Sequence, residues 1–256
     1  SAQQYWHDDT GRGTLRIDVL KPLLKGEGNQ FLSGSVFLAG SVRASKLVRV
    51  EADVPIARVG VAAGTGPAQS ALRIGNPYIG VRIQREGGAV VGQFGVRAPL
   101  ASDPGTSIGS EANMIGALSD PDRLEAFGPQ LLTVRGAVEV RHVTSEGLMI
   151  GAKVGSTLLV TTRSDAIGDK QEVFADYGAR VGYQGAAVLA TVGVTGRAWL
   201  TESDLSFSER TTHQLTGAVE LRQGRVRPSL LVRLPLDEGT RETMHAVVGV
   251  GVAVAF

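Results

Sequence analysis

Apolar and polar residues alternate along most of this chain, with a period of two residues rather than the 3.6 of an α-helix. In the segment 248–256, valines alternate with glycines and alanines up to Phe256. In the segment 226–234, Arg227, Ser229 and Arg233 lie between apolar residues. A period of two places successive side chains on opposite faces of a β-strand. The pattern therefore predicts strands with one apolar and one polar face over nearly the whole sequence.

Turn signals divide the chain into twelve such segments, most of them about 10–15 residues long. Strands of soluble proteins usually have about 5–6 residues, whereas a tilted strand that crosses a bilayer needs about 9–11. The lengths therefore favour a transmembrane barrel. The predicted strands are 12–21, 31–42, 47–57, 71–85, 89–100, 131–144, 148–161, 172–183, 186–200, 213–222, 225–236 and 243–256.

The connections between these strands alternate between short and long. Short turns such as 145–147 alternate with long stretches such as 101–130, and bacterial outer-membrane barrels have short periplasmic turns and long extracellular loops. Because twelve is even, both ends of the chain are expected on the periplasmic side. The sequence thus predicts an all-β fold, a single twelve-stranded antiparallel transmembrane β-barrel over 12–256 with the long loop 101–130, preceded by a periplasmic N-terminal tail, 1–11.

A soluble barrel or sandwich is the alternative, because it shows the same alternation with its faces reversed. Three features favour the membrane. The strands are long, the polar face mixes charged residues with Gly and Ala, and the final strand ends in an aromatic residue, Phe256.

Two segments depart from strict alternation. In 71–85 the register slips at Asn76-Pro77, and because proline cannot donate to a strand ladder we expect a bulge or bend there. In 31–42, Leu38 and its alternate residues compete with Phe37 for the outer face. We expect the leucine face to be the lipid-facing one.

The longest loop contains the one stretch that does not resemble a strand. Residues 119–127 combine Pro121 in a first helical turn with Asp122 and Glu125 near the positive helix end, which favours a short helix. A plain surface loop is the alternative. Long loops are usually functional or disordered, and we expect 101–130 to fold into the barrel or to cap it.

Composition and charge narrow the function classes. Lys plus Arg number 26 and Asp plus Glu 25, for a net charge of +1, so no electrostatic case exists for a nucleic-acid partner. Cysteine is absent, which excludes disulfides and thiolate chemistry. No apolar run approaches the roughly 18 residues of a membrane helix. The chain begins at Ser1, and we expect a signal peptide to have been removed.

The charged residues of this nearly neutral chain are unevenly distributed between the two faces of the strands, once the apolar face is assigned to lipid. The opposite face then carries a net charge of +6, and the remaining residues carry −5. Arg or Lys on a lipid-facing strand position costs roughly 2–4 kcal/mol at the bilayer midplane, so these side chains are expected to face inward. The predicted basic lumen consists of Arg16, Arg49, Arg82, Arg97, Arg135, Arg141, Lys153, Arg180, Arg197, Arg222, Arg227 and Arg233. The predicted acidic pore-lining residues are Asp18, Glu51, Asp53, Glu139, Asp176 and Glu220.

This inner face has two interpretations. Rings of Arg and Lys favour anions in a conducting pore, whereas Arg–carboxylate networks can instead fill a small lumen. Because the acids neutralise half of the bases, we favour the pore. Arg97, Arg135, Arg180 and Arg197 have few acidic neighbours in sequence, and we expect them at the constriction as unpaired cations.

The segment Val248-Gly249-Val250-Gly251-Val252-Ala253-Val254-Ala255-Phe256 resembles the closing strand of Gram-negative outer-membrane β-barrels. The resemblance implies an outer-membrane location and recognition of Phe256 by the barrel assembly machinery. Ile74-Gly75-Asn76-Pro77-Tyr78-Ile79-Gly80-Val81, with Val96-Arg97-Ala98-Pro99-Leu100, is similar to twelve-stranded barrels of the aromatic-degradation (meta-pathway) transporter type. This second resemblance implies a solute channel.

Signals for catalysis are weak. No His-x-Ser pair falls on an outward face, and the histidine and two aspartates at 7–9 lie in the predicted tail. The sequence therefore predicts no enzyme, no cofactor and no metal site. A thin outer aromatic girdle is expected from Phe94, Tyr177, Tyr183 and Phe256.

Together these patterns predict a porin-like outer-membrane channel for passive passage of small, anionic solutes. The alternative is a non-conducting barrel that anchors or scaffolds an envelope assembly. The expected partners are outer-membrane lipid, the barrel assembly machinery, small solutes and envelope proteins that contact the long loops, with no nucleic acid.

Overall fold

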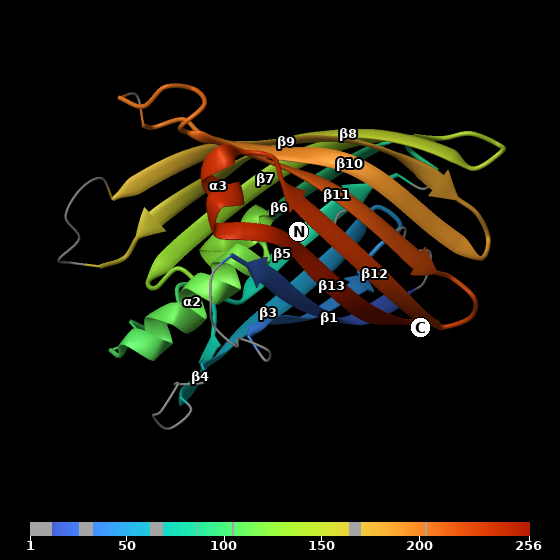
Figure 1. The fold of residues 1–256 in the computed structure, drawn as a ribbon. Helices are drawn as coiled ribbons and strands as arrows, with labels where there is room; N and C mark the ends of the chain where they lie inside the picture. Colours follow the sequence, from blue (N-terminus) through green and yellow to red (C-terminus); the bar gives the residue numbers. More distant parts are fainter. Residues whose placement is uncertain are drawn as a thin grey trace.

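The protein forms a closed antiparallel barrel in a computed structural model (Figure 1). The structure describes residues 12–25, 33–61, 69–85, 87–103, 105–163, 170–202 and 204–256. Strands that are adjacent in sequence pair with one another, and the last strand pairs with the first, from Thr14 opposite Ala255 to Leu24 opposite Met244. The predicted tail 1–11 lies outside the described residues.

Thirteen strand segments in the described residues make up twelve positions around the barrel, as predicted. The fourth and fifth segments both pair with the third, so they are two parts of one interrupted strand. Their bounds are β1 Gly13–Leu24, β2 Gly34–Arg43, β3 Val48–Val61, β4 Gln69–Ile74, β5 Tyr78–Gln84, β6 Val90–Arg97, β7 Leu131–Val143, β8 Leu148–Thr161, β9 Gln171–Gln184, β10 Val188–Trp199, β11 Thr211–Leu221, β12 Val226–Pro235 and β13 Met244–Ala255.

The break between β4 and β5 falls at the predicted irregularity. The side chain of Asn76 donates from Nδ2 to the carbonyl oxygens of Glu125, at 3.0 Å, and Gly128, at 2.7 Å. Its Oδ1 accepts from the backbone N–H of Ala101 at 2.7 Å. A side chain at Gly75 would collide with the carbonyl oxygen of Ala126. The strand is therefore interrupted where the connection between β6 and β7 docks against it.

The outer surface is apolar at alternate strand positions. In β1, Leu15 and Ile17 are 61% and 51% exposed, whereas Arg16 and Asp18 between them are 6% and 4% exposed. A continuous apolar surface of this kind is rare on a protein in water, and it matches a lipid environment. In β2, Leu38 is exposed and Phe37 is fully buried, so the predicted outward leucine face is confirmed at Leu38.

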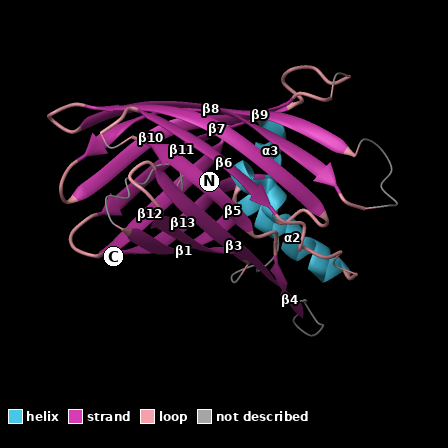
Figure 2. Ribbon diagram, turned by 180° about the vertical axis from the view of Figure 1, so that it is seen from behind, coloured by secondary structure: helices cyan, strands magenta, loops and turns pink. Residues whose placement is uncertain are grey.

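The helices lie at the end of the barrel that carries the long connections (Figures 1 and 2). α2 spans Ser107–Ser119, the 3₁₀-helix η1 spans Pro121–Ala126, and α3 spans Glu238–Thr243. The predicted helical turn at 119–127 is confirmed by η1. α2 was not predicted, and its residues were expected to form part of a loop. None of the helices in the described residues is long and apolar enough to cross a membrane.

Candidate functional site: the charged lumen and its plug

The eighteen charged residues expected on the inner face share one environment. Thirteen of them are buried and the other five are half-buried. They alternate along each strand with the exposed apolar residues of the outer surface, so they project into the lumen. The half-buried residues are Arg49, Arg141, Lys153, Arg222 and Arg227.

The connection between β6 and β7 folds into the lumen, as expected. We call residues 105–130 the plug. α2 packs against β1, β2, β3 and β4, and its N-terminal Thr106 accepts at Oγ1 from the N–H of Gly109 at 3.2 Å. Apolar packing holds the plug to this side of the wall, because Ala112 and Ile115 form a buried cluster with Val59 of β3.

A second apolar contact lies just after η1. Phe127 is buried, and its ring meets that of Phe37 edge-on at a centroid distance of 5.9 Å. Gly116 of α2 faces the ring of Phe127 so closely that a side chain at this position would collide with that ring. The guanidinium of Arg123 lies over the ring of Phe37, 3.4 Å from its centroid. These contacts fix the position of η1 relative to β2.

Ion pairs join the plug to strands on different sides of the barrel. Asp120 lies 2.7 Å from Nη1 of Arg233 on β12 and 2.8 Å from Nη2 of Arg123. Arg123 also approaches Asp53 of β3 at 3.4 Å. All four side chains are buried. Asp120 and Arg123 therefore latch η1 between β3 and β12.

A second latch joins η1 to β10 and β11. Glu125 pairs with Nη1 of Arg197 at 3.1 Å. Asp122 accepts from Nε2 of Gln214 at 2.7 Å and from Oγ1 of Thr195 at 3.3 Å. The plug thus places three carboxylates and one guanidinium in the lumen, which offsets part of the positive charge of the wall.

Asp120 and Glu125 of the plug are held in their ionised form. Burial alone would raise the pKa of Asp120, but Arg233 and Arg123 hold it far below its ordinary value. Burial likewise opposes ionisation of Glu125, and Arg197 and other wall arginines lower its pKa overall. The latches are therefore charged across the physiological pH range.

The four arginines expected to be unpaired at the constriction have carboxylate partners instead. Arg97 pairs with Asp53 at 2.8 Å, Arg180 with Glu139, Arg197 with Asp176 at 2.7 Å, and Arg135 with Asp176 at 3.7 Å. The expectation that they are isolated cations is wrong, because neighbouring strands and the plug bring carboxylates that sequence proximity does not reveal.

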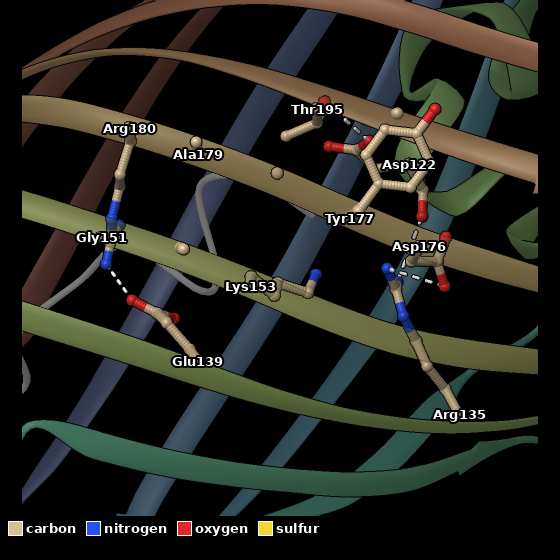
Figure 3. A pocket seen from close by; sticks show the side chains of 13 residues that line it. Asp122, Arg135, Glu139, Gly151, Lys153, Asp176, Tyr177, Ala179, Arg180 and Thr195 are labelled. Carbon is tan, nitrogen blue, oxygen red and sulfur yellow. Dashed lines mark hydrogen bonds and ion pairs between the residues drawn. The ribbon is translucent and has the colours of Figure 1, made fainter.

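A small cavity of about 20 Å³ lies between the plug and the wall formed by β7 to β10 (Figure 3). Figure 3 shows Arg180 directed at Glu139, Arg135 directed at Asp176, and Lys153 between these pairs. A space of this size holds about one water molecule. Charged side chains therefore surround this small cavity in the lumen.

One polar chain on the outer face was not anticipated. The hydroxyl of Tyr177 lies 2.7 Å from Nε2 of His213, and Nδ1 of His213 lies 2.9 Å from Asp237. These residues alternate with luminal neighbours, so the chain is on the outside, next to α3. It ties the β12–β13 connection to β9 and β11. The expected aromatic girdle includes exposed Phe94 and Tyr183, whereas Tyr177 is half-buried by this contact.

The described residues contain no group of three or more His, Asp or Glu side chains placed to hold a metal ion. The arrangement that the chain does offer is electrostatic: a charged inner wall is bridged by the plug through ion pairs.

Comparison with known proteins identifies the fold. No protein-family model matches the chain, and no curated protein matches it by sequence. Among solved structures, the COG4313 outer membrane channel from Pseudomonas putida F1 superposes with a TM-score of 0.65 at 8% identity, covering 98% of this chain and 97% of that chain. The NanC porin gives a TM-score of 0.54 at 9% identity, covering 94% of this chain and all of its own.

The KdgM porin also superposes, with a TM-score of 0.50 at 10% identity over 95% of this chain and 99% of its own. Such low identities are informative about architecture alone. They confirm the resemblance to outer-membrane barrels at the level of the fold, and the chain has the fold of the twelve-stranded outer-membrane β-barrels.

Proposed function

We propose that the protein is an outer-membrane channel for passive passage of small anionic solutes. The observation that carries this proposal is the sorting of charge, with twelve basic and six acidic side chains on the inner face of a barrel whose outer face is apolar. A confined wall with excess Arg concentrates anions because charge interactions are stronger there than in bulk water. The solved channel and porins with the same fold support the proposal.

The proposed orientation follows from the connections. The short turns face the periplasm and the long connections, including the plug, face the cell exterior, as in other bacterial barrels. Outer-membrane lipid surrounds the apolar face. We include recognition of Phe256 by the barrel assembly machinery in the proposal, because this residue completes the alternating pattern of β13.

In this channel the plug sets the constriction. The eighteen predicted lumen residues line the path, but many are engaged with the plug or with one another. The small cavity between η1 and the β7–β10 wall has room for about one water molecule. In this proposal, passage of a larger solute requires the plug to shift from the latched position.

The latched plug also favours a second candidate function, a non-conducting barrel that anchors or scaffolds an envelope assembly through its long loops. Buried Arg–carboxylate pairs at both latches are what a permanently closed lumen requires. In that case the partners are envelope proteins rather than solutes.

Single-channel recording in a planar bilayer separates the two candidates. The full chain is refolded and its closed barrel is verified by heat-modifiable migration on a gel. Steady conductance supports the channel. Electrical silence from folded protein, both in the wild type and in a plug-latch variant such as Asp120→Asn, supports the scaffold and contradicts the channel.

A further inference from the structure

We propose that the short-turn end of the barrel contains a binding site for small multivalent oxyanions, such as phosphate esters or polycarboxylates. A cavity of about 570 Å³ opens at this end, opposite the plug. It is formed by the β2–β3 and β5–β6 turns, the end of β7 and Gln184 of β9. We call it the basic vestibule. Its volume is in the range of small-molecule sites.

The lining of the basic vestibule is strongly cationic. None of the described residues that line it is a carboxylate. Arg82 is buried, Arg49 and Arg141 are half-buried, and the others are exposed at the rim. The site therefore has a buried arginine at its base and exposed cations around its opening. Its basic residues are Arg43, Lys46, Arg49, Arg82, Arg85 and Arg141.

The strand register places three of these arginines in one row. Arg43 of β2 is directly opposite Arg49 of β3, and Arg49 is directly opposite Arg82 of β5. An oxyanion held between them therefore contacts more than one guanidinium group.

Neutral oxygens help to hold these side chains in place. Nη1 of Arg49 donates to Oγ of Ser41 at 3.2 Å, and Nε of Arg43 donates to the carbonyl oxygen of Ser45 at 3.2 Å. Such contacts orient the guanidinium groups. The wall carboxylates Glu51 and Glu139 do not line the cavity, and Glu139 pairs with Arg180. Glu86, in the β5–β6 turn, lies outside the described residues.

The chemistry of the row selects the ligand class. Guanidinium groups bind carboxylate and phosphate oxygens in a bidentate manner, and several of them in one cavity favour a ligand with more than one negative charge. The biological role of the basic vestibule depends on the proposed channel, because the vestibule would hold a solute at the periplasmic mouth of that channel. Binding itself requires no conduction.

The test is calorimetric titration of the folded full chain in detergent with pyrophosphate and with citrate, at constant ionic strength, and with acetate as the monovalent comparison. We expect saturable binding of both multivalent probes, stronger than that of acetate. The double variant Arg49→Gln, Arg82→Gln should weaken binding by roughly tenfold or more, because it removes two of the guanidinium groups that line the vestibule. Arg225→Gln is the matched control, since Arg225 is exposed in a turn at the same end and does not line the vestibule.

Each outcome decides the proposal. No saturable binding by folded protein, or equal affinity in the double variant and the wild type, overturns it. Tight binding of a polyglutamate peptide without binding of either small probe also overturns it, and indicates an acidic protein segment instead. Binding by a barrel that does not conduct keeps the vestibule and contradicts the channel, whereas conduction without binding does the reverse.

Discussion

Asp120 and Arg233 form an ion pair at 2.7 Å inside the lumen, with side chains 0% and 1% exposed. The pair joins the start of η1 to β12, which β13 separates from β1, one of the strands that α2 packs against. Burial of an ion pair costs desolvation energy, and removal of one partner leaves an uncompensated buried charge. The position of the plug therefore depends on this contact.

Asp120→Asn is expected to release η1 from β12. The loss of the carboxylate leaves Arg233 buried without its counter-ion, which costs about 3–5 kcal/mol, so the plug should leave its latched position for part of the time. We expect a higher mean conductance in planar bilayers and faster cleavage of the plug by protease. Asp103→Asn is the control, because Asp103 pairs with Arg163 at an exposed site. Unchanged conductance and cleavage in Asp120→Asn would show that the latch does not hold the plug.

Phe127→Ala tests whether apolar contacts hold the plug against the barrel wall. The buried ring contacts Phe37, and its removal leaves a cavity at a cost of about 3–5 kcal/mol. The measurement is the free energy of plug undocking, obtained from the rate of proteolysis as a function of denaturant. Phe207→Ala, at an exposed loop position, should have no effect. If both variants behave like the wild type, the aromatic contact does not contribute to docking.

Acid should open the plug only at low pH. Folded-state pKa values lie below the ordinary values of 3.8 for Asp120 and 4.5 for Glu125. The stabilisation from their ionised forms is therefore fully present above those ordinary values and is lost as the pH falls through the lowered ones. We expect conductance to be constant from about pH 7 to about pH 5 and to rise only in stronger acid. A rise in conductance between about pH 7 and about pH 5 would show that groups other than Asp120 and Glu125 control the position of the plug.

Phe256→Ala should lower the amount of assembled barrel in the outer membrane, because the closing strand loses the aromatic residue that we expect the assembly machinery to read. The ring also lies against Gly13, where a side chain would collide with it. Heat-modifiable barrel on a gel is the readout. Phe94→Ala, another exposed strand aromatic, is the control. Equal amounts of barrel in both variants would remove the proposed role of Phe256.

The alternation of residues was sufficient to predict the barrel, its strand number and its two faces. At Arg16 and Asp18, for example, period two determines orientation once the apolar face is given to lipid. The break at Asn76 was also visible, because proline follows it.

The arrangement inside the lumen could not be predicted in the same way. Arg97 and Asp53 are separated by 44 residues, and Arg197 and Glu125 by 72. These contacts depend on the barrel register and on the path of the plug. α2 was missed because its sequence lacks a clear amphipathic pattern and acidic residues in its first turn. Sequence proximity of charges was therefore a poor guide to which arginines have partners.

The reversal potential of single channels across a KCl gradient tests the central proposal most directly. The excess of basic side chains on the inner wall predicts a potential shifted toward the chloride equilibrium value, and a smaller shift at high salt, where the screening length falls below about 10 Å. Loss of selectivity in Arg135→Ala or Arg180→Ala would assign it to the β7–β9 wall. A conducting barrel that is cation-selective or unselective would contradict the anion channel.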